Sequence, residues 1–237
     1  MATFESQVSA VTGLIDTFTS STNPKDTELD QFLRDGVIDV TNRILQMRPQ
    51  DIELFARTTT SDSQSVNVGG ARIISVMREA NEDGSSDGST AWRSCRKVPS
   101  SLQSRVVDPD SLYFASIFNP VYTLQNNSLV HVYPTPSSNN GIKVTHVNKS
   151  PVNGNGDALL HSHDDILYFP EDKVYLVVLY AAIASLEAKL GEYVIDEEDT
   201  ELTQAIQVII TSLKQKYDTA FSLMAPRQAA QPQGQEA

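Results

Sequence analysis

The hydrophobic period of this 237-residue chain changes twice, and this change constrains the fold more than any other feature. Near both ends, apolar residues recur every three or four positions, which is the spacing of an amphipathic helix. From about residue 58 they instead alternate, as they do in half-buried strands. The pattern predicts an α+β fold, in which N- and C-terminal helices form one bundle and an antiparallel β-rich domain is inserted between them.

Two helices are predicted in the N-terminal part. The first apolar stripe runs from Phe4 through Phe18, and Gly13 within it weakens the helix only modestly. The second helix is expected to begin near Asp26 and to end before Pro49, because a proline disfavours helical backbone in the residue that precedes it.

Two further helices are predicted in the C-terminal part. The segment Glu171–Leu190 is apolar on most sides, which predicts burial between other layers, and Gly191 is its expected C-cap. The last helix is expected from about Thr200 to Leu223. Its predicted core stripe comprises Leu202, Ile206, Ile209, Ile210, Leu213, Tyr217 and Phe221.

The strongest strand signal is a hairpin. Two β-prone arms, Val121–Gln125 and Ser128–Val132, flank Asn126-Asn127, and asparagine tolerates the positive φ of a tight turn. Gly141–Val147 alternates again and is expected as a third strand, next in an antiparallel meander. The polar, glycine-containing stretch Asn81–Ser89 is expected to be a loop.

These signals predict four segments along the chain. Residues 1–57 and 169–224 form the bundle helices, and residues 58–168 form the β-rich insertion. Residues 225–237 are rich in Gln, Ala and Pro, lack apolar anchors, and are expected to be a disordered tail.

The formal net charge of −12 bears on possible partners. The densest basic group, Arg93, Arg96 and Lys97, is too thin for a dedicated phosphate-binding stripe. An acidic surface would instead let DNA pass without sticking, because like charges repel within a Debye length of about 8–10 Å. Carboxylates concentrate at Glu82-Asp83 and at Asp196–Asp199, and each cluster is also consistent with an ordinary solvated surface.

No membrane association is expected. The longest apolar run, near Val174–Ile183, is shorter than the roughly 20 residues of a membrane span, and the N-terminal residues show no signal peptide. The single cysteine, Cys95, excludes an intramolecular disulfide and fits a reducing compartment.

One short run invites a metal interpretation. His161-Ser162-His163-Asp164-Asp165 contains imidazoles and carboxylates, which can bind zinc or a similar ion, but it also fits a solvated polar loop. The other two histidines, His131 and His146, fall within predicted strands and are expected on strand faces.

No motif for catalysis was found. The basic neighbours of Cys95 could lower the pKa of its thiol, but no nucleophile signature surrounds it. The sequence contains no nucleophile elbow, no P-loop and no dinucleotide fingerprint. We therefore expect a structural protein that is not an enzyme, with no catalytic, cofactor-binding or metal residues and no cofactor.

Three stretches carry a family resemblance over roughly residues 25–223. Asp110–Tyr122 (DSLYFASIFNPVY), Leu129–Pro136 (LVHVYPTP) and Phe169–Ile183 (FPEDKVYLVVLYAAI) resemble virion structural proteins of tailed bacteriophages, particularly of cyanophages. Together with the helix-flanked layout, they are similar to the head–tail adaptor (connector) proteins of the neck. No functional residue of that family maps onto a single position of this chain.

The resemblance implies a homo-oligomeric ring of twelve copies that binds the portal protein on one side and tail or neck proteins on the other. It implies that the genome passes through the channel without specific binding, and that the protein is found in the virion neck and, during assembly, in the host cytoplasm. Another virion component, such as a capsid-surface or tail protein, is an alternative. A metal-dependent hydrolase using His161 and His163 is the alternative from another class.

Overall fold

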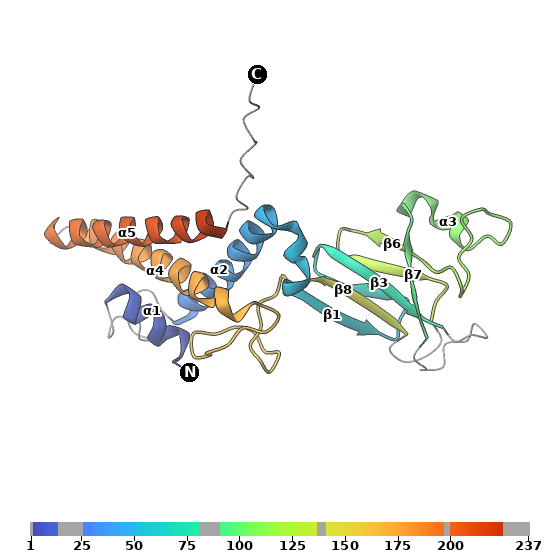
Figure 1. The fold of residues 1–237 in the computed structure, drawn as a ribbon, viewed down its shortest axis with the longest axis horizontal. Helices are drawn as coiled ribbons and strands as arrows, with labels where there is room; N and C mark the ends of the chain where they lie inside the picture. The colour runs from blue at the N-terminus through green and yellow to red at the C-terminus, as the bar shows by residue number, and fades with distance from the viewer. Residues whose placement is uncertain (1, 14–25, 81–90, 137–140, 197–199, 225–237) are drawn as a thin grey trace, which may run out of the picture. The chain divides into compact units, whose positions relative to one another are not determined.

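A computed structural model of the chain describes residues 2–13, 26–80, 91–136, 141–196 and 200–224 (Figure 1). The chain divides into two compact units. The helical unit comprises residues 1–51 and 150–237, and the β unit comprises Ile52–Lys149. The predicted α+β class is confirmed, because the long helices lie in the helical unit and the strands lie in the β unit. The predicted loop 81–89, the tail 225–237 and the carboxylates 197–199 lie outside the described residues.

The helical unit is built around one apolar helix. Helix α4 (Val174–Asp196) contacts α1 (Phe4–Thr12), α2 (Asp26–Met47) and α5 (Thr200–Met224). Its buried positions lie on several sides, as its almost continuous apolar sequence requires. They include Leu176, Val177, Ala181, Ala182 and Leu186.

By length and composition alone, the segment Glu171–Val194 could also cross a membrane. In the structure this segment is the central helix of a bundle, and the core helix of a soluble protein passes the same test. Its apolar character is therefore accounted for by packing against three other helices.

The first helix is shorter than predicted. It ends at Thr12, because Gly13 adopts a left-handed conformation with φ of 72° and its N–H bonds the carbonyl of Ser9 at 2.9 Å. The predicted continuation to Phe18 lies outside the described residues. Glycine at this position therefore acts as a C-cap, where the sequence analysis treated it as a weak interior residue.

Helix α4 is longer than predicted, because it continues through Gly191. The Nζ atom of Lys189 lies 2.9 Å from Oε2 of Glu192 and 5.0 Å from the ring centroid of Tyr193. These contacts, three and four residues apart, support the turn that contains the glycine. They offset the cost of an interior glycine, which is about 1 kcal/mol relative to alanine.

The stripe of α5 is confirmed in part. Ile206, Ile210, Leu213, Tyr217 and Phe221 are buried, so the predicted period is correct. Leu202 and Ile209 are exposed and do not belong to the core. They lie at the margin of the stripe, where helical geometry turns a side chain away from α4.

The described residues of the β unit form two four-stranded sheets that share a core. One has the order β1-β8-β3-β4 and the other β2-β7-β6-β5, and every pairing is antiparallel except β5 with β6. Residues of both sheets meet in the core, including Val76, Ile142, Val130 and Val132. The strands are β1 (Ala56–Ser61), β2 (Ser65–Asn67), β3 (Ile73–Glu79), β4 (Trp92–Ser94), β5 (Arg96–Lys97), β6 (Val121–Gln125), β7 (Leu129–Tyr133) and β8 (Ile142–Val147).

The predicted hairpin is confirmed, and the predicted meander is wrong. Asn126 and Asn127 have φ values of 50° and 59°, as a tight turn between β6 and β7 requires. Strand β8 does not continue from β7 but pairs with β1 and β3 in the other sheet. Strand β2 pairs with the edge of β7 that β8 was expected to occupy. The apolar face of β8 instead packs against that of β7 in the core that the two sheets share.

The observed boundaries of the β unit differ from the predicted insertion of residues 58–168. Residues 150–168 form few strand pairings and belong to the helical unit. The backbone N–H groups of Phe4 and Glu5 bond the carbonyls of His163 and His161 at 2.8 and 3.0 Å. Arg34 Nε also donates to the carbonyl of Leu159 at 3.0 Å, so helix α2 holds this segment as well.

Candidate functional site

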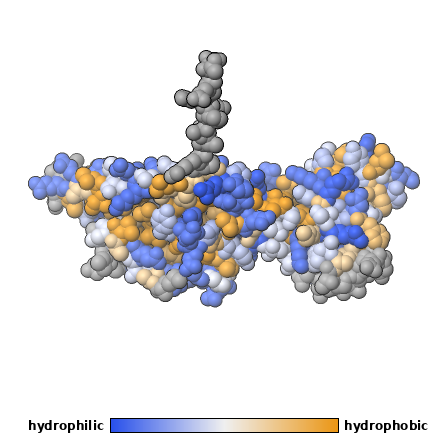
Figure 2. Space-filling view, in the orientation of Figure 1, coloured by the Kyte–Doolittle hydropathy of each residue, from blue (hydrophilic) through white to orange (hydrophobic). Residues whose placement is uncertain are grey.

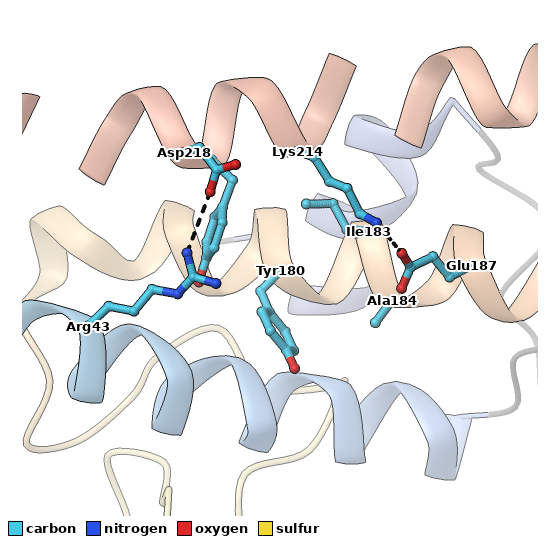
Figure 3. A pocket seen from close by; sticks show the side chains of 8 residues that line it. Arg43, Tyr180, Ile183, Ala184, Glu187, Lys214 and Asp218 are labelled. Carbon is cyan, nitrogen blue, oxygen red and sulfur yellow. Dashed lines mark hydrogen bonds and ion pairs between the residues drawn. The ribbon is translucent and has the colours of Figure 1, made fainter. Parts of the chain in front are cut away.

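A cavity of about 300 Å³ opens among helices α2, α4 and α5 of the helical unit (Figure 3). Its lining combines aromatic rings with charged side chains of both signs. The lining residues are Arg43, Tyr180, Ile183, Ala184, Glu187, Lys214, Tyr217 and Asp218.

The charges around this cavity are paired with one another. Lys214 Nζ lies 2.6 Å from Oε1 of Glu187, which links α5 to α4 (Figure 3). Arg43 pairs with Asp39 at 2.9 Å and with Asp218 at 3.5 Å. Its guanidinium also lies 5.0 Å from the ring centroid of Tyr217, a cation–π contact that links α2 to α5.

Tyr217 is the most strongly perturbed group of this cavity. Burial, together with the hydrogen bond that its hydroxyl donates to Asp39, raises the pKa of Tyr217 far above its usual value. Burial also raises the pKa of Tyr180. Both hydroxyls therefore stay protonated at neutral pH, and that of Tyr217 joins helix α5 to helix α2 as a donor to Asp39.

The two histidines of the candidate metal run are held by protein groups. The backbone N–H of His161 donates to Oδ1 of Asp30 at 2.5 Å, and ring Nδ1 lies 2.9 Å from the same oxygen. Ring Nδ1 of His163 accepts from the backbone N–H of Leu160 at 3.1 Å, and its Nε2 lies 3.2 Å from Nδ2 of Asn153. The run is a loop in which Ser162 and Asp165 are exposed, as the solvated alternative predicted, but both histidines are partly buried.

This geometry gives the pair a structural role. His161 fastens the segment after residue 150 to helix α2 through Asp30, and His163 closes its own loop. Among the described residues, no three His, Cys, Asp or Glu side chains converge as metal ligands. The other two histidines lie on strands, as predicted: His131 in β7 and His146 in β8.

Cys95 is a buried structural thiol. Burial raises the pKa of Cys95 to about 12, and the positive charge of Arg78 offsets only part of that effect. The basic neighbours Arg93, Arg96 and Lys97, which could have lowered this pKa, do not do so, because desolvation is the larger effect. Arg78 itself donates to the carbonyls of Pro134 and Thr135, at 2.8 and 3.2 Å.

A second cavity, of about 530 Å³, lies in the helical unit at the start of α4. We call it the acidic-rimmed cavity, because carboxylates accompany an apolar lining. The lining residues are Gln7, Asp164, Asp165, Ile166, Phe169, Glu171, Val174 and Tyr175. Sequence reasoning missed this site, because it considered Asp164 and Asp165 only as metal ligands beside the histidines.

The β unit carries an apolar surface segment that the sequence analysis also missed. We call residues 107–118 the apolar loop; it follows helix α3 (Gln103–Val106). Leu112 is 100 % exposed, Val107 61 % and Phe118 54 %. Figure 2 shows hydrophobic residues gathered at the surface in the region of α3. The signal in the sequence was a run of large apolar residues after Asp108-Pro109-Asp110, with no strand or helix period.

The two units differ sharply in charge. The β unit contains eight acidic and nine basic residues, whereas the helical unit contains 22 acidic and nine basic residues. The whole acidic excess of the chain therefore resides in the helical unit. A site for a polyanion is disfavoured on that unit, because like charges repel.

Comparison with known proteins identifies a family that the chain matches. The family model described as SU10 adaptor protein matches residues 5–235, which include nearly all of both units. No curated protein matches the chain.

Proposed function

The chain belongs to the SU10 adaptor protein family, whose members are phage structural proteins of the adaptor type, and we propose that its copies form the ring that joins head to tail in the virion neck. In this role the protein acts by assembly and not by catalysis. The proposal is consistent with the paired charges of the cavity among α2, α4 and α5 and with a single cysteine that is buried.

The proposed ring consists of twelve copies, with the portal protein on one side and tail or neck proteins on the other. Subunits assemble in the host cytoplasm and remain in the neck of the virion. Head-to-tail contacts between identical subunits close into a ring when their rotation allows it, so one repeated interface suffices.

The charge partition supports a channel for the genome. Duplex DNA carries about one negative charge per 1.7 Å of its axis. A wall formed by the helical unit, with 22 acidic and nine basic residues, would repel this polymer weakly and let it slide. A basic wall would instead retain it through many phosphate contacts.

The family match over residues 5–235 is the observation that carries the proposal. The test is electron microscopy of the phage particle, with the subunit located by fitting its two units separately. We expect a closed ring between portal and tail, with helical units facing the channel. A position on the capsid surface would contradict the adaptor role. A ring in the neck whose channel is lined by Lys and Arg would contradict only the sliding argument.

A further inference from the structure

We infer that the apolar loop of one subunit inserts into the acidic-rimmed cavity of a neighbouring copy; this inference rests on the proposed ring and names its repeated contact. The loop lies in the β unit and the cavity in the helical unit. The contact joins two different surfaces of identical chains, which is the heterologous type that can close a ring.

The apolar loop is ordered before any partner binds. A hydrogen bond of 2.9 Å runs from the N–H of Ala115, within the loop, to the carbonyl of Val106, the residue just before it. Within it, the N–H of Ser111 bonds the carbonyl of Asp108 at 3.1 Å, and the N–H of Phe114 bonds the carbonyl of Ser111 at 3.0 Å. A loop held in this way loses little conformational entropy on binding.

The same order makes the exposure of Leu112 informative. In the isolated subunit the side chain of Leu112 is fully exposed to water, so it buries no apolar surface and contributes no stability to the loop. Val107 and Phe118 extend the exposed apolar surface around it. Patches of this kind on otherwise polar proteins mark interaction surfaces, where a central apolar anchor fills a pocket.

Unpaired cations accompany the loop. The guanidinium carbon of Arg93 lies 5.2 Å from the ring centroid of Phe118, and its buried Nε has no hydrogen-bond partner among the residues described. The N–H of Arg96 bonds the carbonyl of Pro120, next to the end of the loop, and Arg105 directly precedes Val106. Within the part of the chain that the structure describes, none of these three arginines forms an ion pair.

The acidic-rimmed cavity has the complementary chemistry. Ile166, Phe169 and Val174 supply apolar lining, and Asp165 and Glu171 are exposed carboxylates beside them. Its volume of about 530 Å³ lies within the range of ligand pockets, roughly 300–1,000 Å³, and is ample for one or two apolar side chains. The adjacent Lys173 is paired with Asp172 at 2.6 Å, so it does not cancel the negative rim.

The charge partition favours a second copy as the occupant. Identical subunits with a net charge of −12 repel one another overall, so a stable contact must bring unlike surfaces together. The loop itself carries two exposed carboxylates, Asp108 and Asp110, but residues 93–118 together hold four basic and two acidic residues. This net positive stretch of the β unit and the carboxylate-rimmed cavity of the helical unit meet that requirement. Another virion protein in the cavity or on the loop is an outcome of the test.

The first test uses Leu112→Asp in the full-length chain, with self-association measured by sedimentation and electron microscopy. We expect ring formation to weaken by about 30-fold or more, as for a central anchor of an interface. The melting temperature of the monomer should not change, because Leu112 is fully exposed. Val208→Asp, at an exposed apolar position of α5, is the matched control and should keep the ring.

The second test reverses charge on each side. Arg96→Glu with Arg105→Glu, and separately Asp165→Lys with Glu171→Lys, should each weaken self-association, and the combined variant should restore it.

Rings that persist with Leu112→Asp overturn the inference and leave the proposed function standing. A wild-type chain that is monomeric at all concentrations, or a variant that loses only binding to another virion component, also overturns it. The adaptor role is decided separately, by the position of the subunit in the particle.

Discussion

The hydroxyl of Tyr217 donates a hydrogen bond of 2.7 Å to Oδ2 of Asp39, and this bond joins helix α5 to helix α2. The same carboxylate oxygen pairs with Nε of Arg43 at 2.9 Å, and the Arg43 guanidinium lies over the Tyr217 ring. The three side chains form a closed set of contacts. Residues separated by more than 170 positions in the sequence thus meet at one point of the bundle.

Tyr217→Phe removes the donor and keeps the ring. We expect a loss of about 1–2 kcal/mol in the free energy of unfolding, because Asp39 retains Arg43 as a partner. The change in the free energy of unfolding is measured by urea denaturation, with circular dichroism as the signal. Tyr175→Phe, at an exposed position, is the control and should change stability little. Equal stability of both variants would show that the Tyr217 bond contributes nothing.

Truncation of the α5 core stripe tests whether it is intramolecular. Leu213→Ala and Phe221→Ala should each lower the free energy of unfolding by about 2–5 kcal/mol, because both side chains are buried within the single subunit. Leu223→Ala, at an exposed position, is the control. A Leu213 variant with unchanged stability but lost oligomerisation would assign the stripe to a subunit interface.

The burial of His146 predicts a dependence of stability on pH. Desolvation lowers the pKa of this imidazole below its usual value of about 6.5, so the unfolded chain binds a proton that the folded protein refuses. The contribution of neutral His146 to the free energy of unfolding is fully present above the pKa of the unfolded chain. It is lost as the pH falls through the pKa of the folded protein. We expect His146→Gln to flatten the decline in stability as pH falls below about 6.5. An unchanged pH profile in that variant would refute the assignment.

The thiol of Cys95 should react slowly in the native protein. Its pKa of about 12 and its burial leave almost no accessible thiolate at neutral pH. A thiol-reactive dye should label it only at the rate at which the protein unfolds, and fully in denaturant. Rapid, stoichiometric labelling of the native protein would show that this part of the β unit opens readily.

The local preferences of the sequence were sufficient to predict several elements. Asn126 and Asn127 predicted the hairpin, because their tolerance of positive φ is a property of the residues themselves. Helix α2 begins at the predicted Asp26 and ends before Pro49, since the restriction that proline imposes on its preceding residue is also local. The candidate surfaces were not predicted, because neither cavity nor exposure is a property of one segment.

Tertiary packing decided the remaining features. A hydrophobic pattern indicates which face of a segment is apolar, but it does not indicate which other segment covers that face. The pattern of β8 was therefore equally compatible with a place beside β7 in the same sheet and with its observed place in the opposite sheet. The same reason explains why Leu112 could be read as an ordinary core residue, although none of the described residues of its own subunit covers it. Coverage depends on contacts between residues far apart in the chain, and only the assembled fold determines them.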